Sequence, residues 1–128
     1  MYLRFALPEL DEHSGHKLGI FQAAYRLKDS GGLPPWDESR LKECTRWFTV
    51  HLPVPACYKQ GSVQSICWFK QDAQDCVERI WDVVWLLKEH GFNPVMLTTA
   101  RPGAIVYEDV FQVAAIPWRK YGLQAQPV

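Results

Sequence analysis

The sequence has no excess of charge of either sign and no long apolar run. Its 14 lysines and arginines balance 14 aspartates and glutamates, so the 128-residue chain has no net charge at pH 7. Nonspecific nucleic-acid binding depends on many phosphate contacts, and a neutral chain does not favour nucleic acid as a partner. The longest apolar stretch, IWDVVWLL, is interrupted by Asp82 and is much shorter than the roughly 20 residues that span a bilayer. We therefore expect no membrane association.

Cysteine is also scarce, and no two cysteines form a C-x-x-C pair. The four cysteines are Cys44, Cys57, Cys67 and Cys76. Secreted disulfide scaffolds are usually shorter and denser in cysteine. The opening residues, MYLRFALPEL, do not resemble a signal peptide, because Arg4 and Pro8 interrupt the apolar run. These features predict a reducing, cytoplasmic location.

Motifs that bind phosphate or carry out catalysis are missing as well. The sequence contains no glycine-rich phosphate loop, no G-x-S-x-G elbow and no H-E-x-x-H pair. Cys44 and Cys76 fall on the apolar stripes of predicted helices, and Cys57 is the one cysteine expected in an exposed loop. We therefore expect no cofactor and no cysteine nucleophile.

Hydrophobic periodicity predicts the order strand, helix, helix, strand, helix and then three strands. Leu3, Phe5 and Leu7 alternate in the first strand, which we expect Pro8 to end. The expected helices begin within 17–32, at Pro34–Pro35, and at Asp72 as an N-cap. The remaining strands are predicted in 63–70, 94–99, 104–107 and 110–116, and the last three of these as an antiparallel meander.

This order is typical of an α+β fold. We expect a mostly antiparallel sheet of about five strands with three helices packed on one face, in the order β-α-α-β-α-β-β-β. A chain of 128 residues fits one domain. We assign residues 1–118 to a single α+β domain and residues 119–128 to a C-terminal tail that is partly frayed.

The stretch RPGAIVYEDVFQV, residues 101–113, holds the main candidate site. Pro102 and Gly103 suit the centre of a type II turn. Arg101 could bind a carboxylate or phosphate, with Tyr107 or Glu108 beside it as an acid or base. Turn chemistry explains most of these residue types, so an ordinary polar hairpin tip, reversed at Glu108–Asp109, is favoured over a site. If the hairpin has a function, a recognition surface is favoured over a reaction site. Strand alternation predicts Ile105 and Tyr107 on one face of the sheet, and Val106 and Glu108 on the other.

Several further residues are candidates for binding. Gln112 shares a predicted strand face with Val110 and Ala114, and Trp68 and Lys70 end the strand before the third helix. Lys70 could hold an anion there, although Asp72 and Asp75 would repel it. The candidate binding set is thus Arg101, Tyr107, Glu108, Gln112, Trp68 and Lys70.

Histidines offer two weaker possibilities. His13 and His16, in the segment EHSGH, have a spacing that could hold zinc, but no third or fourth ligand is indicated, so a solvated loop is the expectation. His51 could serve as an acid or base. It shares a helix face with Phe48 and Leu52, where a hydrogen-bonded core histidine is the commoner outcome.

The segments LGIFQAAYRL, ICWFK and RPGAIVYEDVFQV resemble those of small single-domain bacterial proteins to which no mechanism is attached. The resemblance covers the chain from the first helix to the last strand. It implies a bacterial cytosolic origin and carries over no catalytic residue.

Six tryptophans are more than a domain this short usually holds, and tryptophan is enriched at interfaces. We therefore expect a non-enzymatic binding module that contacts a protein partner or a second copy through the C-terminal meander and exposed aromatics. The alternative is a small hydrolase or nuclease with acid–base groups near Arg101 and Tyr107. Self-association through an unpaired sheet edge is a third possibility, with the first and last strands as the expected edges.

Overall fold

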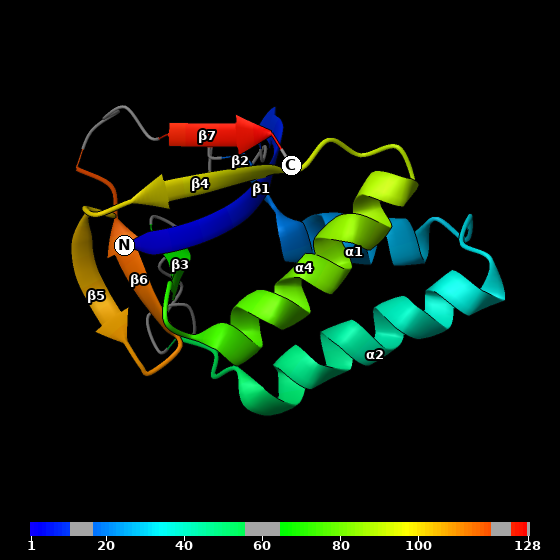
Figure 1. Cartoon of the computed structure of the whole chain (residues 1–128), viewed down its shortest axis with the longest axis horizontal. Coiled ribbons are helices and arrows are strands. Elements are labelled where there is room, and N and C mark those ends of the chain that lie inside the picture. Colours follow the sequence, from blue (N-terminus) through cyan, green and yellow to red (C-terminus); the bar gives the residue numbers. More distant parts are fainter. Residues whose placement is uncertain (11–16, 56–64, 119–123, 128) are drawn as a thin grey trace.

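The computed structural model describes residues 1–10, 17–55, 65–118 and 124–127. Its elements, in chain order, are β1 (Tyr2–Leu10), β2 (Lys17–Gly19), α1 (Ile20–Asp29), α2 (Pro35–His51), β3 (Ile66–Lys70), α4 (Gln74–Glu89), β4 (Val95–Thr99), β5 (Ala104–Glu108), β6 (Gln112–Ile116) and β7 (Gln124–Pro127). The α+β class and the predicted order β-α-α-β-α-β-β-β are confirmed, and the two short strands β2 and β7 extend the sheet. The three helices lie together on one side of the sheet (Figure 1).

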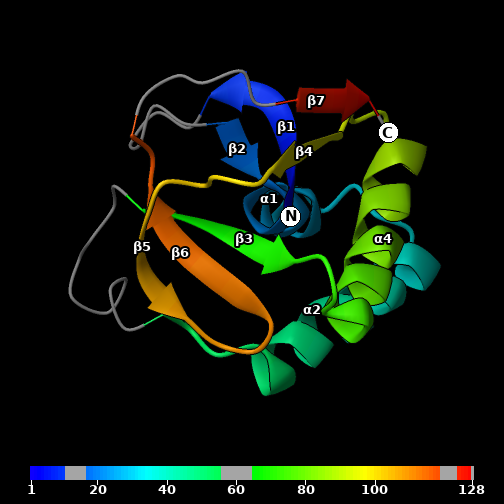
Figure 2. The same ribbon diagram turned by 60° about the vertical axis from the view of Figure 1, so that its left-hand side comes forward.

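The strand order of the sheet is β5-β6-β3-β1-β4-β7, and β2 pairs with the far part of β1. Every described strand pair is antiparallel. β1 therefore lies in the middle of the sheet, and the expectation that the first strand forms an edge is wrong. The predicted last strand, now β6, is also interior, because β3 and β5 flank it (Figure 2).

The predicted three-stranded meander is wrong as well. β4 pairs with β1 over five residue pairs, from Tyr2↔Thr99 to Ala6↔Val95, and it does not pair with β5. Of the three predicted meander strands, only β5 and β6 pair with each other. The RPG segment is therefore not a hairpin turn: it carries the chain from β4 across to the opposite edge of the sheet.

Gly103 makes this crossing possible. Its φ is +131°, and a Cβ atom added there would overlap the carbonyl group of Ile116. Pro102 and Gly103 are both buried, so the segment packs closely against the end of β6. A residue with a side chain cannot follow this path without a shift of the backbone.

β1 continues past Pro8 to Leu10, so the prediction that Pro8 ends the strand is wrong. Proline lacks an N–H, and it is tolerated in strands at edges and bulges. Pairing with β4 ends at Ala6, and pairing with β2 has a register shift between Ala6 and Leu10. Pro8 therefore sits at an irregular position where a ladder hydrogen bond is not needed.

The helices cover one face of the sheet and form the main core with it. Alternation in β1 directs Phe5 and Leu7 to this face, where both are buried. The predicted stripe of α4 is buried throughout, and its members are Cys76, Ile80, Val83, Val84 and Leu87. Leu41 and Phe48 of α2 complete the core from the far helix, as helical spacing predicts.

Helix ends follow the expected residues with one exception. Gly31 and Gly91 have positive φ values after α1 and α4, and Pro35 opens α2. Asp72 is not the N-cap of α4. That position is Ala73, which offers no side-chain hydrogen bond. The first turn of α4 thus starts without the expected cap.

A second, smaller apolar cluster lies on the sheet face that points away from the helices, which we call the outer face. It consists of Ala6, Trp68, Leu97 and Val113, each no more than 3% exposed. Arg4 lies in the same row of side chains and donates a hydrogen bond to the carbonyl oxygen of Cys67. Both faces of the central strands therefore contribute to stability.

The close approach at Gly103 leads to a stability prediction. Gly103→Ala should lower the free energy of unfolding by about 3 kcal/mol, because it combines an unfavourable φ with a backbone clash. Gly31→Ala is the matched control, since its φ is +71° but no atom lies within 4 Å of the added Cβ; it should cost only about 1 kcal/mol. Urea unfolding of both variants measures the difference. Equal losses would show that the Ile116 contact is unimportant.

Candidate functional site

The β5–β6 turn is held by a carboxylate at its centre. Tyr107 Oη donates a hydrogen bond to Asp109 Oδ2 at 2.7 Å. The backbone N–H groups of Phe111 and Gln112 donate to Asp109 Oδ1 at 2.8 and 3.0 Å. Burial alone would raise the pKa of Asp109, but the hydrogen bonds from Tyr107, Phe111 and Gln112 together lower it. The hydrogen bonds of Tyr107 and Asp109 therefore stabilise the β5–β6 turn.

Gln112 ties this turn to the helical layer. Its Nε2 donates to the carbonyl oxygen of Pro53 at 2.7 Å and to Asp109 Oδ2 at 3.2 Å. The residue is only 3% exposed. Gln112 thus joins β6 to the segment that follows α2, and its amide is not accessible to a partner at the surface.

A bulge in β5 changes the faces expected for its side chains. Ile105 pairs with Ala115 but Tyr107 pairs with Ala114, so Val106 is an extra residue in the strand. The prediction that Ile105 and Tyr107 share a face is therefore wrong. Ile105 and Glu108 share the outer face, while Tyr107 points toward the helical side.

Lys70 and Glu108 form an ion pair on the outer face, with Nζ 2.6 Å from Oε2. The hydrogen bond to Glu108 raises the pKa of Lys70. The Lys70 ammonium group is therefore paired with a β5 side chain and is not available to bind an anion at the start of α4. Glu108 keeps an exposed side chain, at 53% of its full area.

Arg101 lies beyond the opposite end of β5. It lines a surface hollow of about 360 Å³ together with Thr99, Ala100 and Trp118. Its backbone N–H donates to Thr99 Oγ1, and its guanidinium has no ion-pair or hydrogen-bond partner among the described residues.

Arg101 and the turn residues do not form one site. Ala104 and Glu108 pair with opposite ends of β6, about four residues of strand or roughly 13 Å apart, and Arg101 precedes Ala104 by three residues. The structure thus places the six candidate residues in three places: Arg101 in the hollow, Trp68 in the outer-face cluster, and the other four around the β5–β6 turn.

The tryptophans divide between core and surface. Trp68 is 2% exposed, so this candidate binding residue belongs to the interior; its Nε1 has no hydrogen-bond partner in the part of the chain that the structure describes. Trp36, Trp85 and Trp118 are exposed. Of these three, only Trp118 lies beside candidate binding residues.

β5 is the outermost strand on its side of the sheet (Figure 2). Ile105 and Val106 are 44% and 46% exposed, and Val110 just beyond the strand is 73% exposed. We call this surface the β5 edge: Ile105 and Val106 at its centre, Arg101 and Trp118 at its start, and Glu108, Asp109 and Val110 at its end. Sequence reasoning missed its position because it placed β4 next to β5.

The cysteines and histidines do not assemble a reaction site in the described part of the chain. Burial raises the pKa of Cys76 to about 11 and raises the pKa of Cys44 as well, so both stay protonated thiols at neutral pH. His51 is exposed rather than buried: it stacks on Trp47 and its Nδ1 donates to the Trp47 carbonyl oxygen.

A metal site is not found within the described ranges, where no three His, Cys, Asp or Glu side chains are placed to hold an ion. The weak zinc candidates His13 and His16, and the loop cysteine Cys57, lie outside the described residues.

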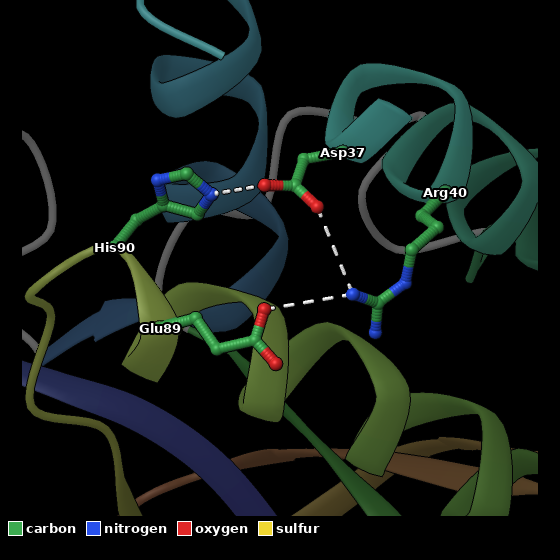
Figure 3. Close-up of polar contacts among 4 residues, drawn as sticks. All are labelled: Asp37, Arg40, Glu89 and His90. Atoms are coloured by element: carbon green, nitrogen blue, oxygen red, sulfur yellow. Dashed lines mark hydrogen bonds and ion pairs between the residues drawn. The ribbon is translucent and has the colours of Figure 1, made fainter. Parts of the chain in front are cut away.

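A polar cluster that the sequence did not indicate joins the ends of two helices. His90, after α4, donates from Nε2 to Asp37 Oδ2 at 2.9 Å (Figure 3). Arg40 lies 3.7 Å from Asp37 and 3.5 Å from Glu89. The cluster links the first turn of α2 to the last turn of α4, where the two helix dipoles favour an acidic and a basic group respectively. Its side chains bond to one another across the two helices, which favours a structural role.

Comparison of the chain with protein-family models, with curated proteins and with solved structures finds no match. None of the helices in the described ranges has the length and apolar character that crossing a bilayer requires. Function must therefore be argued from the surface itself.

The Asp109 network predicts a pH-dependent loss of stability. The pKa of Asp109 is lower in the folded state than its ordinary value of 3.8, so its contribution is complete above that value and is lost as the pH falls through the folded-state pKa. Asp109→Asn should be less stable than wild type by about 1 kcal/mol at pH 7, and the gap should narrow in acid. Urea unfolding as a function of pH checks this. Glu78→Gln, on the exposed side of α4, should show neither effect.

The helix-end cluster predicts different coupling energies for two of its contacts, Asp37–His90 and Arg40–Glu89. Asp37 and His90 are about one-fifth exposed, whereas Arg40 and Glu89 are roughly half exposed and farther apart. Double-mutant cycles with alanine should give about 1 kcal/mol for Asp37–His90 and under about 0.5 kcal/mol for Arg40–Glu89. A larger value for the exposed pair would contradict this ranking.

Proposed function

We propose that this protein is a non-enzymatic interaction module whose binding element is the β5 edge. An extended segment of another polypeptide would pair with β5 and continue the sheet. The observation that carries the proposal is the exposure of Ile105 and Val106 on a strand that has a sheet neighbour on its β6 side only, within the described residues.

The chemistry of a sheet edge supports this role. An outermost strand presents backbone N–H and C=O groups that can pair with a further strand, and side-chain pockets then add specificity. Proteins that avoid such pairing usually place lysine, proline or inward charges on the edge. β5 has none of these between Ala104 and Tyr107. Its protective features are its short length, Glu108 at its end and the bulge at Val106, which limit the length over which a partner can pair.

The surroundings of β5 suit recognition better than catalysis. The acid–base alternative requires Arg101 to act with Tyr107 or Glu108, and these lie at opposite ends of the strand. Tyr107 is bonded to Asp109, and Glu108 is paired with Lys70. These contacts give the end of the hairpin a defined shape, which reduces the entropy lost when a partner binds.

The setting we propose is the bacterial cytosol, as the sequence suggests. The three cysteines in the described ranges, Cys44, Cys67 and Cys76, are free thiols, which is what a reducing compartment maintains. A protein partner fits this surface better than nucleic acid does, because the centre of the β5 edge is apolar and the chain has no net charge.

A peptide-selection experiment tests the proposal. Peptides selected from a displayed random library against the wild-type protein should bind Val106→Lys at least tenfold more weakly, because a lysine at the centre of the edge opposes strand pairing. Val50→Lys is the matched control: Val50 is 70% exposed on α2, which contributes no residue to the β5 edge, and its substitution should leave binding unchanged. Failure to select any peptide, or equal binding by Val106→Lys, would contradict the proposal.

A further inference from the structure

We infer that the strand that pairs with β5 is β5 of a second copy of this chain, related to the first by a two-fold axis. The inference rests on the proposed function, since it names the occupant of the same edge. In such a pair the two β5 strands run antiparallel, and each contributes the same surface to the contact.

Charge at the two ends of the β5 edge carries the inference. The start bears Arg101, which is exposed and has no charged partner within the described residues. The end bears Glu108, which is paired with Lys70 and keeps a side chain that is 53% exposed, followed by Asp109, whose oxygens accept hydrogen bonds within the turn. The two carboxylates outnumber the one ammonium group, so this end stays acidic. Antiparallel pairing about a two-fold axis places the start of one strand beside the end of the other. Each Arg101 then meets the acidic end of the partner strand, and this happens twice in one dimer.

Apolar side chains follow the same symmetry. Ile105 and Val106 lie near the middle of the edge, so the two copies would bring them together at the axis. Trp118 stands at the start, beside Arg101, and Val110 stands at the end; they are 56% and 73% exposed. The two-fold arrangement sets Trp118 of each copy toward Val110 of the other. The same surface thus provides both members of the charged contact and both members of the apolar contact.

An unrelated peptide could also occupy the edge, but it would have to supply an acidic end, an apolar centre and a basic end in the correct direction. A second copy has this pattern already. The strand is only five residues long and bulged, so the contact area is modest, and a dimer that dissociates on dilution is expected.

Charge reversal on the full chain tests the arrangement. We expect wild type to dimerise in sedimentation equilibrium, and Arg101→Glu and Glu108→Arg each to weaken dimerisation about tenfold, because each places like charges together at both ends. An equal mixture of these two variants should form a heterodimer as strong as the wild-type dimer, since every contact is again between opposite charges. A protein with both substitutions should likewise recover.

Two controls keep the result clear. Glu108→Arg also breaks the pair with Lys70, so its fold is checked by circular dichroism. If the arginine variant unfolds, Glu108→Gln serves in its place. Val106→Lys is the negative control of the mixing experiment, because no partner variant should restore its dimerisation. Val50→Lys should dimerise as wild type does.

Each other outcome overturns the inference. A wild-type monomer at all concentrations means that a second copy is not the occupant, while peptide binding to β5 would still support the proposed function. A dimer that survives Val106→Lys uses another surface. A dimer that Val106→Lys abolishes, but that charge-reversed mixtures do not restore, pairs in a different direction or register.

Discussion

The pairing of β1 along both of its edges determines where every other strand of this protein lies. β3 and β6 extend the sheet on one side of β1, and β4 and β7 extend it on the other. Side chains of β1 alternate between two cores, with Phe5 and Leu7 under the helices and Ala6 in the outer-face cluster. A central strand buried on both faces leaves little freedom in register, because a shift of one residue would exchange the two sets of side chains.

The exposed position of β5 is a consequence of that arrangement. After β4, the chain travels to the other end of the sheet, where β5 pairs with β6, while the second edge of β4 pairs with β7. Gly103 allows the close passage over Ile116 that this route requires. The hydrogen bonds of Asp109 then hold the turn between β5 and β6, and Gln112 joins β6 to Pro53 after α2. The edge is therefore a rigid part of the fold and is not a loose terminal hairpin.

The sequence predicted what depends on local periodicity and missed what depends on distant pairing. The helical stripe of α4, from Cys76 to Leu87, is a repeat within one element, and it is buried as expected. The place of β1 in the sheet depends on contacts with residues more than 60 positions away, and alternation is the same in an edge strand and a central one. The bulge at Val106 adds one residue to β5, so the side chains after it point to the opposite faces of the sheet. No residue pattern in the sequence indicates this bulge. Asp37 and His90 meet only because α2 and α4 are of similar length and pack with opposite ends together. The sequence offered two signals for this contact: Asp37 lies in the first turn of a predicted helix, and His90 lies just before Gly91, which ends another.

The same reasoning explains why the residue types of the main candidate stretch were informative while their grouping was not. Arg101, Tyr107 and Glu108 are close in sequence, which suggested one site, but an extended strand separates residues that a helix would bring together. Tyr107 and Asp109 are hydrogen-bonded to each other within the turn, and Lys70 neutralises part of the charge of Glu108. What remains on the surface is an apolar strand with Arg101, which has no charged partner among the described residues, at its start and the half-exposed side chain of Glu108 at its end. A surface whose two ends carry opposite charge is complementary to itself when turned through a half rotation, whereas the same residues gathered in one pocket would not be.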